Sequence, residues 1–326
     1  MKRLAACAAF GVLALTACGG DEDAASDTGA PVVSDGPVAT AADVPVSADV
    51  PVSLDVPVSA DVPVSADIPA GGDAAACASA NTKTAGQLTI ATGDPAFPPY
   101  VVDDAPESGE GFEAAVGKAV AEQMGFSGDA VTWIRTSFDV AIAPGEKDFD
   151  FNLQQISISD ERSEIVSFST PYYTSNQAVL GYVDGPAAGV TSLTDLKSLK
   201  LGAAAGTTSL SFIIETIDPD VEPFAFNSNA DAKVALDNQQ IDAIITDLPT
   251  GLFISAVEIE GTKVFGQFPV DAGGAGDQWG LLFEQDSPLV ECADLALAAL
   301  TASGELAAIQ EQWMGDYAEA PILSVA

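Results

Sequence analysis

A six-residue motif between Ala42 and Pro69 does most to limit what this chain can fold into. It reads ADVPVS at Ala42 and Ala48, LDVPVS at Leu54, ADVPVS at Ala60 and a shortened ADIP at Ala66. A proline every sixth residue excludes a helix or a central strand. The segment from Gly19 to Ala76 is also acidic and has no aromatic residue, so it predicts an extended, disordered tether. A β-solenoid is the alternative, but it needs large apolar residues in register.

The first residues have the features of an export signal. Lys2 and Arg3 precede an apolar run, Leu4 to Leu15, which is too short to span a membrane. The following residues, up to Cys18, resemble the bacterial lipoprotein signal, which implies cleavage before Cys18 and acylation of its thiol. The alternatives are a plain secretory signal or a membrane anchor. We therefore expect a signal peptide at 1–17, a lipidated cysteine and tether at 18–76, and an extracytoplasmic, lipid-anchored protein.

The charge of the chain excludes several classes of function. There are 48 Asp and Glu against 11 Lys and Arg, no His, and a net charge of −37. This argues against nucleic acid as a partner and against histidine-based acid-base or metal chemistry, so we expect no cofactor. After the leader no apolar stretch is long enough to cross a membrane, which argues against a permease or a channel. Adaptation to high salt is an alternative explanation for the excess of acidic residues.

The cysteines predict one disulfide bond. Cys7 is removed with the leader and Cys18 is lipidated, so Cys77 and Cys292 remain in an oxidising compartment, where we expect them to pair. The bond closes a loop of 292 − 77 = 215 residues. It places the start and the end of the folded region side by side. Two free buried thiols are the alternative.

The body, Cys77 to Ala326, alternates strand and helix patterns and predicts an α/β fold. In its first part, Leu88–Thr92, Val131–Ile134 and Phe149–Leu153 are expected strands, and apolar residues at helical spacing run from Phe112 to Met124. Later in the chain we expect strands at 201–204 and 241–246 and helices at 210–216, 231–236, from 287–288 onward, and 305–314. We expect a first lobe at 77–180, a second at 181–279 and a return to the first at 280–326, with two crossings between the lobes.

Arg162 is the most suggestive single residue, because only it and Arg135 remain once the leader is removed. It lies close to Ser157 and Gln155, after an expected strand, where open α/β sheets bind ligands. Guanidinium binds a carboxylate bidentately. The alternative is a surface arginine paired with a neighbouring glutamate.

Five segments together resemble the amino-acid-binding type of periplasmic solute-binding protein that serves ABC importers. They are LTIATGDPAFPPY at 88–100, GEGFEAAVGKAVAEQMGF at 109–126, FDFNLQQISISDERSEIVSFSTPYY at 149–173, LKLGAAAGTTS at 199–209 and IDAIITDLPT at 241–250. The resemblance implies two α/β lobes, each a sheet flanked by helices, joined by two hinge strands and closing on a ligand.

The resemblance also implies roles for individual residues. Arg162 matches the arginine that grips the ligand α-carboxylate, with Ser157 assisting from the same loop, and Thr207 matches a threonine at a helix start in the second lobe. Asp247 matches the aspartate that pairs with the ligand α-ammonium. Its alternative role, capping a turn before Pro249, is common for a strand-end aspartate.

The expected side-chain pocket consists of Asp94, Phe97, Phe138 and Gln155. Phe97 and Phe138 match positions that line or sandwich the ligand side chain, although plain core packing is an alternative, above all for Phe138. Asp94 accepts hydrogen bonds from an amide or a cation and repels an acid, which favours polar neutral or cationic amino acids. The chain departs from the family at Ala115, where an aspartate is common, and at Gln154–Gln155, where small residues are common.

These observations favour a monomeric binding protein that captures a free amino acid and delivers it to an ABC transporter permease. A sensing lobe for a membrane receptor uses the same binding chemistry and stays open as an alternative. A dehydratase-type enzyme on this scaffold is less favoured, because we find no His, no free Cys nucleophile and no nucleophile-elbow motif.

Overall fold

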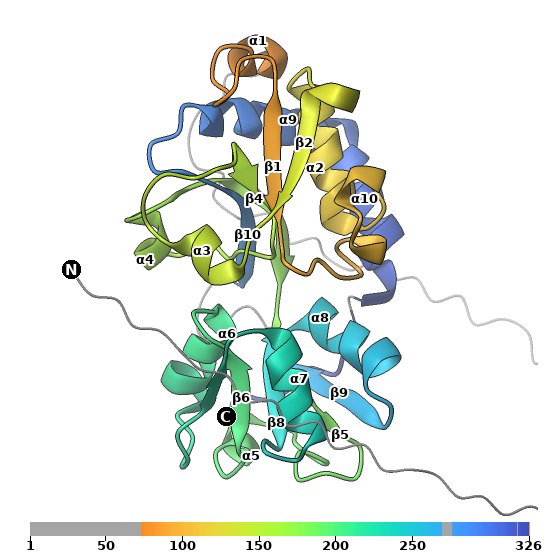
Figure 1. Cartoon of the computed structure of the whole chain (residues 1–326). Helices are drawn as coiled ribbons and strands as arrows, with labels where there is room; N and C mark the ends of the chain where they lie inside the picture. Colours follow the sequence, from red (N-terminus) through yellow and green to blue (C-terminus); the bar gives the residue numbers. More distant parts are fainter. Residues whose placement is uncertain (1–72, 269–275, 318, 326) are drawn as a thin grey trace, which may run out of the picture. The chain divides into compact units, whose positions relative to one another are not determined.

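The computed structural model describes residues 73–268, 276–317 and 319–325. The predicted signal peptide, Cys18 and nearly all of the tether lie outside the described residues. Within them the chain forms two α/β lobes, each built on a five-stranded sheet (Figure 1). The predicted fold class, two sheets flanked by helices, is therefore confirmed.

The sheet of the first lobe has the strand order β2-β1-β3-β10-β4. Its strands are β1 (Leu88–Thr92), β2 (Val131–Arg135), β3 (Phe151–Asn152), β4 (Ser167–Ser175) and β10 (Asp277–Phe283). β1 pairs in parallel with β2 and β3, whereas β10 is antiparallel to β3 and β4. The three parallel strands therefore end at the same edge of the sheet, and the loops that follow them emerge together.

Helices cover this sheet and close the first core. They are α1 (Ala74–Ala78), α2 (Phe112–Gln123), α3 (Phe138–Ile142), α4 (Asp160–Ser163), α9 (Leu289–Ser303) and α10 (Glu305–Met314), with short 3-10 turns at Val102–Asp104, Pro106–Ser108, Gly128–Ala130 and Gly315–Tyr317. The apolar stripe of α2 is buried against α9 and α10, with Phe112 and Leu297 in the core. No single helix in the described ranges is long and apolar enough to span a membrane. α9 with the segment Glu305–Tyr317, bent by 80°, passes that test by length and composition only.

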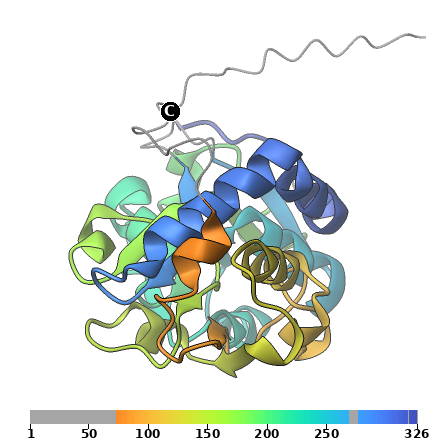
Figure 2. The same ribbon diagram turned by 90° about the horizontal axis from the view of Figure 1, so that it is seen from above.

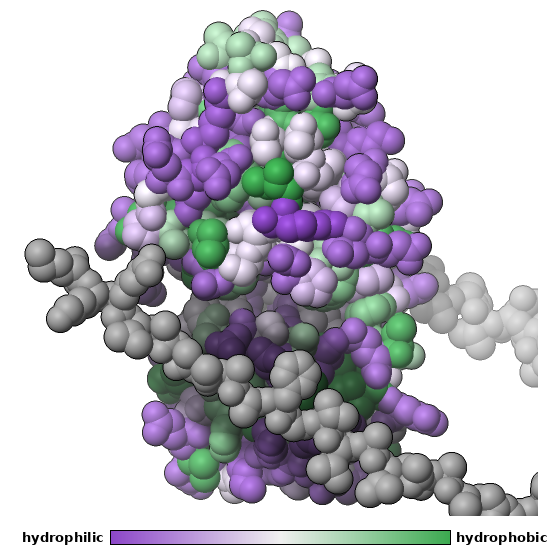
Figure 3. Space-filling view, in the orientation of Figure 1, coloured by the Kyte–Doolittle hydropathy of each residue, from purple (hydrophilic) through white to green (hydrophobic). Residues whose placement is uncertain are grey.

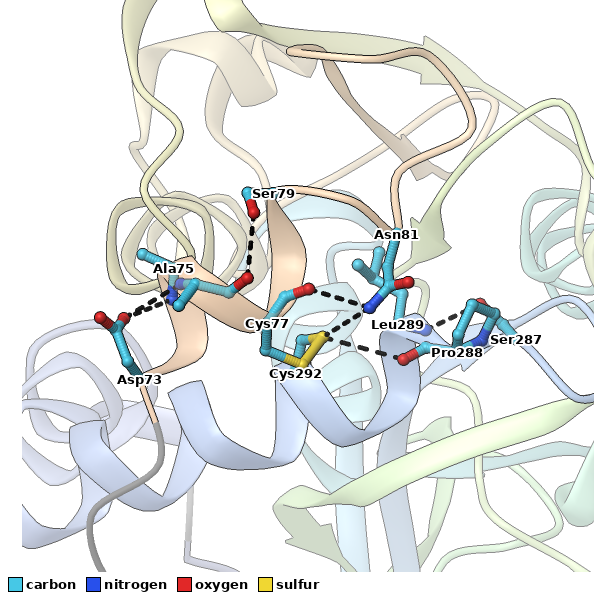
Figure 4. The surroundings of a disulfide bond; sticks show 10 residues. Asp73, Ala75, Cys77, Ser79, Asn81, Ser287, Pro288, Leu289 and Cys292 are labelled. Atoms are coloured by element: carbon cyan, nitrogen blue, oxygen red, sulfur yellow. Dashed lines mark hydrogen bonds between the residues drawn. A yellow bond between two sulfur atoms is a disulfide. The ribbon is translucent and has the colours of Figure 1, made fainter.

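A disulfide bond joins the two ends of the first lobe. Cys77 in α1 is bonded to Cys292 in α9, across a sequence separation of 215 residues, as predicted. The amide of Asn81 donates to the carbonyl oxygen of Cys77 at 2.9 Å, which fixes the loop after α1 (Figure 4). α1 consequently lies along α9 when the lobe is viewed from above (Figure 2).

The sheet of the second lobe has the order β7-β6-β8-β5-β9. Its strands are β5 (Gln177–Tyr182), β6 (Leu201–Ala204), β7 (Phe224–Phe226), β8 (Ala243–Asp247) and β9 (Thr262–Gln267). β6 is parallel to β7 and β8, and β5 is antiparallel to β8 and β9. The parallel strands again send their following loops to one edge of the sheet.

The helices of the second lobe begin at polar caps. They are α5 (Leu193–Leu196), α6 (Thr208–Ser211) continued by the π-helical segment Phe212–Ile217, α7 (Asn229–Asp237), and α8 (Leu248–Phe253) continued by Ile254–Glu258. The side chains of Ser192, Thr207, Ser228 and Asp247 each accept a hydrogen bond from a backbone N–H in the first turn. Two of these caps stand at the sheet edge, because Thr207 lies shortly after the end of β6 and Asp247 is the last residue of β8.

The lobe boundaries differ from the predicted ones. β5 belongs wholly to the second sheet, so the first crossing is at Asn176 rather than at 180–181. β10 begins at Asp277 in the first sheet, slightly before the predicted return at 280.

The end of the chain also departs from the prediction. We expected residues 280–326 to stay in the first lobe, but Ile322 and Ser324 form β-bridges with Gln267 and Ser192 of the second lobe. Leu323 is buried in the core of the second lobe. The expectation of two crossings was therefore wrong, because a third connection returns after Tyr317. Burial of Leu323 supplies the physical reason.

Candidate ligand-binding site

A cavity of about 480 Å³ lies between the two lobes. Its walls are the loops that follow the parallel strands of both sheets, together with the start of β5 and β10. Figure 3 shows a hollow between the upper and lower parts of the folded body, with hydrophilic side chains over much of the visible surface above it. The volume lies within the range of small-molecule sites.

All eight residues predicted to bind ligand line this one cavity. Five come from the first lobe and follow β1, β2 or β3, and two come from the second lobe and follow β6 or β8; the eighth, Arg162, is carried by α4. The full set is Asp94, Phe97, Phe138, Gln155, Ser157, Arg162, Thr207 and Asp247. The structure therefore brings the predicted residues together, while their individual roles toward a ligand stay predictions.

Arg162 is buried, with 8% of its surface exposed. Its guanidinium donates to the carbonyl oxygen of Ser157 at 2.5 Å and, across the cavity, to that of Gly206 at 2.9 Å. The ring of Phe138 covers it, with the guanidinium carbon 5.5 Å from the ring centroid. Burial lowers the pKa of Arg162. The alternative of a surface arginine is thereby excluded.

Gly206 owes its position to a backbone conformation that favours glycine. Its φ is +72°, which turns the chain from β6 into α6 and aims the carbonyl group at Arg162. Next to it, the hydroxyl of Thr207 donates to the carbonyl oxygen of Ala204 at 2.6 Å and caps α6. The Thr207 hydroxyl is therefore already engaged. The feature suited to an anion is instead the start of the helix at Thr208, where the first N–H groups have no partner within the helix.

Ser157 also reaches the second lobe. Its hydroxyl oxygen lies 3.3 Å from that of Thr208, and Gln177 lies 3.5 Å from Thr208 through its side-chain nitrogen. Two further groups of the first lobe lie near Ser157 at this end of the cavity and complete a polar cluster. They are the guanidinium of Arg162 and the carboxylate of Asp277. This is the end at which the sequence predicted a carboxylate to bind.

Asp247 is half-buried in the cavity wall of the second lobe, where β8 runs into α8. One carboxylate oxygen accepts hydrogen bonds from the backbone N–H of Thr250 at 3.0 Å and from the hydroxyl of Tyr100 at 2.7 Å. Burial raises the pKa of Asp247. The capping role that the sequence left open is thus real, and it coexists with a position on the cavity wall.

The predicted side-chain pocket is partly acidic and partly aromatic. Asp94 is exposed at the rim, and Phe97 packs edge-on against Tyr100 with ring centroids 5.4 Å apart. Phe138 lines the cavity, but it also packs into a small core of the first lobe and covers Arg162. Both interpretations of Phe138, core packing and cavity wall, therefore apply.

Gln155 is held by a buried glutamate. Glu113, in the first turn of α2, accepts hydrogen bonds from the backbone N–H of Gln155 at 2.7 Å and from its side-chain amide. The hydroxyl of Tyr172 donates to the same carboxylate at 2.5 Å. Gln155 adopts φ +51°, which is unusual for a residue other than glycine, so Glu113 fixes a strained turn in the cavity wall. Burial raises the pKa of Glu113 to about 7.

The charges around the cavity are mostly negative. Among the described residues that line it, the carboxylates are Asp94, Asp139, Asp247, Glu258 and Asp277, and the cationic groups are Arg162 and Lys233. Lys233 forms an ion pair with Glu258 at 2.6 Å, so it is largely neutralised within the second lobe. Such a lining favours a ligand with a positive group remote from its carboxylate.

Several residues that line the cavity or support its wall were not singled out from the sequence. Tyr100 and Glu113 lie inside segments that carried the family resemblance, but neither was assigned a role there. Asp277, Trp279 and Gln177 lie on the strands next to the lobe crossings, where the sequence shows no helical periodicity or turn motif. The pairing of β10 with β4 brings Asp277 and Trp279 to the cavity, and the pairing of β5 with β8 places Gln177 opposite Asp247.

Two lobes closing a cavity at the ends of their parallel strands define a two-lobed solute-binding protein. The sequence model for bacterial extracellular solute-binding proteins, family 3, matches residues 88–316. The chain belongs to this family and is an amino-acid-binding type of solute-binding protein, as the sequence predicted.

Relatives and solved structures are similar over the folded body. The ABC transporter arginine-binding protein 1 of Escherichia coli K12 is 29% identical over 226 residues, covering 67% of this chain and 86% of that protein. The arginine-binding periplasmic protein of Mannheimia haemolytica is 29% identical over 238 residues, covering 71% and 93%. The structure of an ancestral arginine-binding protein bound to glutamine is 26% identical, with a TM-score of 0.59, covering 71% and 99%.

Proposed function

We propose that this protein captures a free amino acid with a cationic or polar neutral side chain outside the cytoplasm and delivers it, as a monomer, to an ABC transporter permease. In this proposal a lipid on Cys18 holds it at the membrane. The observation that carries the proposal is the meeting of Arg162 and Asp247, from different lobes, on one cavity. A guanidinium and a carboxylate on the walls of one cavity suit the two charged groups that every free amino acid carries.

The negative lining supports the choice of side chain. An acidic ligand side chain would add a further negative charge to a cavity that already holds more carboxylates than cationic groups. Bringing like charges together costs several kcal/mol of binding free energy. Asp94 at the rim accepts hydrogen bonds from a guanidinium, ammonium or amide group. The net charge of −37 further raises the local concentration of cations. The arginine-binding names of the relatives point the same way.

Binding rather than catalysis fits the relatives, which are binding proteins. Closure needs no chemistry, because groups of both lobes already meet around the cavity: Arg162 with Gly206, and Tyr100 with Asp247. A ligand seated there adds contacts to both lobes and thereby stabilises the closed form that the transporter receives.

A thermal-shift screen of the purified protein against the common amino acids tests the proposal. A ligand at a thousandfold excess over its Kd adds about 4 kcal/mol to the free energy of unfolding. We expect arginine, lysine or glutamine to raise the melting temperature and glutamate and aspartate not to. A screen in which only acidic amino acids raise it, or none does, contradicts the proposal. Loss of radioactive palmitate labelling in Cys18→Ser tests the anchor separately.

A further inference from the structure

A carboxylate of the protein itself lies at the end of the cavity assigned to the ligand carboxylate. Asp277, the first residue of β10, lines the cavity and accepts a hydrogen bond from the side-chain amide of Gln177. Gln177 in turn lies against Thr208, and Thr208 against Ser157. We call these residues, with Arg162, the anchor cluster. Its hydrogen-bond donors are therefore already shared with a carboxylate before any ligand enters.

The electrostatics agree with this geometry. Burial raises the pKa of Asp277, while hydrogen bonding from Gln177, Thr208 and Ser157 and the charge of Arg162 oppose that rise. In return, Asp277 opposes the lowering of the Arg162 pKa by burial. The two charges thus compensate each other across the cluster. A second carboxylate placed beside Arg162 must share both its charge and the hydroxyl donors with Asp277.

The anchor cluster contains acceptors as well as donors. Both terminal nitrogens of Arg162 donate to backbone carbonyl oxygens, those of Ser157 and Gly206, so part of the guanidinium is already engaged. The buried side-chain oxygen of Gln177 has no hydrogen-bond partner among the described residues. An unpaired buried acceptor is costly, and a ligand N–H group satisfies it whereas a ligand carboxylate does not. The cluster is consequently less selective for an anion than an arginine with two hydroxyl donors would be.

We propose that Asp277 is an internal counter-charge for Arg162, so that the site also accepts cationic amines that lack an α-carboxylate. This deepens the proposed function and rests on it, since the same cavity and the same Asp247 then receive the ligand amine. The substrate class becomes alkyl amines with a distal guanidinium, ammonium or amide group, with or without a carboxylate. Asp277 is in this sense a specificity-determining residue.

A cycle of two ligands and two proteins tests the proposal. L-arginine and agmatine differ only by the α-carboxylate, and Asp277→Asn removes the charge while it keeps an acceptor for Gln177. Isothermal titration calorimetry gives four dissociation constants. We expect wild-type protein to prefer arginine over agmatine by less than about tenfold, and Asp277→Asn to raise that preference by about tenfold or more, since like-charge repulsion is removed. A change in preference below about threefold overturns the proposal.

A matched control and a second measurement complete the design. Asp139→Asn removes another cavity carboxylate, one that hydrogen-bonds to Ser137 instead of the anchor cluster, and should shift both ligands by the same factor. If Asp277→Asn does not fold, wild-type protein alone decides, because a preference for arginine over agmatine above about tenfold then overturns the proposal. If agmatine binds and no amino acid does, the proposed function fails, whereas the role of Asp277 as a counter-charge stands. If arginine binds and agmatine does not, the counter-charge role fails, whereas the proposed function stands.

Discussion

The hydroxyl of Tyr100 in the first lobe donates a hydrogen bond of 2.7 Å to Asp247 in the second, and lies 2.8 Å from the hydroxyl of Thr250. Tyr100 is fully buried, and Trp279 packs edge-on against its ring. A single phenol group therefore connects the two lobes at the residue expected to hold the ligand ammonium. Removal of the Tyr100 hydroxyl should therefore affect lobe closure, whereas removal of the Asp247 charge should affect ligand binding.

Tyr100→Phe should open the ligand-free protein. The change leaves Thr250 and one oxygen of Asp247 with fewer partners in a buried place, which costs about 1–3 kcal/mol in the free energy of unfolding. Small-angle X-ray scattering should show a larger radius of gyration without ligand. Tyr182→Phe is the control, because its hydroxyl hydrogen-bonds to Asp237 within the second lobe. Equal radii for Tyr100→Phe and wild type would contradict the interlobe role.

Asp247→Asn should weaken amino-acid binding with little loss of stability. Asparagine is as good a helix cap as aspartate and can still accept the hydrogen bond from Tyr100, so α8 and the lobe contact persist. The lost charge removes an ionic hydrogen bond worth about 1.5–3 kcal/mol, or about 10- to 150-fold in Kd. Calorimetry and thermal melting check the two halves. Unchanged affinity would exclude Asp247 as the ammonium partner.

Asp94→Asn should change selectivity more than affinity. Because Asp94 lies exposed at the cavity rim, its replacement has little effect on folding. Asparagine still accepts a hydrogen bond from an amide but no longer attracts a cation, so the ratio of arginine to glutamine affinity should fall by about tenfold. Competition titrations measure this ratio directly. A ratio that stays constant would place the ligand side chain elsewhere.

Glu113→Gln should alter the pH dependence of stability. The pKa of Glu113 is about 7 in the folded protein against an ordinary value of 4.5, so the folded state binds more protons between these values and stability falls as pH rises through them. The full effect is about 3 kcal/mol. Urea unfolding at pH 5 and pH 8 should therefore show a smaller decrease for Glu113→Gln than for wild type. Identical decreases would show that Glu113 does not titrate in this range.

Removal of the disulfide should destabilise the protein strongly. The bond closes a loop of 215 residues, which is worth about 5 kcal/mol if constraint of the unfolded chain dominates. The double variant Cys77→Ser, Cys292→Ser should have a much lower urea midpoint, and reduction of wild-type protein should lower its midpoint by the same amount. If the reduced and oxidised proteins unfold at the same midpoint, the bond contributes no stability.

Local sequence patterns predicted much of the fold, because buried apolar residues recur at the spacing of a helix or a strand. Leu88–Thr92, Leu201–Ala204 and Glu305–Met314 occur with the predicted bounds, since each has a clear apolar pattern or a marked break. β4, β5, β9 and β10 were not assigned, because they pair across long sequence separations and their side chains face two environments. β10 in particular lies between strands of distant sequence.

Those cavity residues that lie where a strand ends and a loop begins could be predicted from the sequence. Arg162 comes after β3 and Asp247 ends β8, so the sequence could place both at a sheet edge. Tyr100, Glu113 and Asp277 act through contacts with residues 147, 42 and 100 positions away in the chain, with Asp247, Gln155 and Gln177 respectively. No local pattern encodes such pairs.

The third connection between the lobes limits how the molecule can move. Ile322 pairs with Gln267 at the edge of the second sheet, while the preceding helices are packed on the first lobe. These bridges tie the last described residues of the chain to the second lobe, whereas α9 and α10 are packed on the first. Any opening of the cavity must therefore carry Ile322–Ser324 along with the second lobe while α9 and α10 stay with the first.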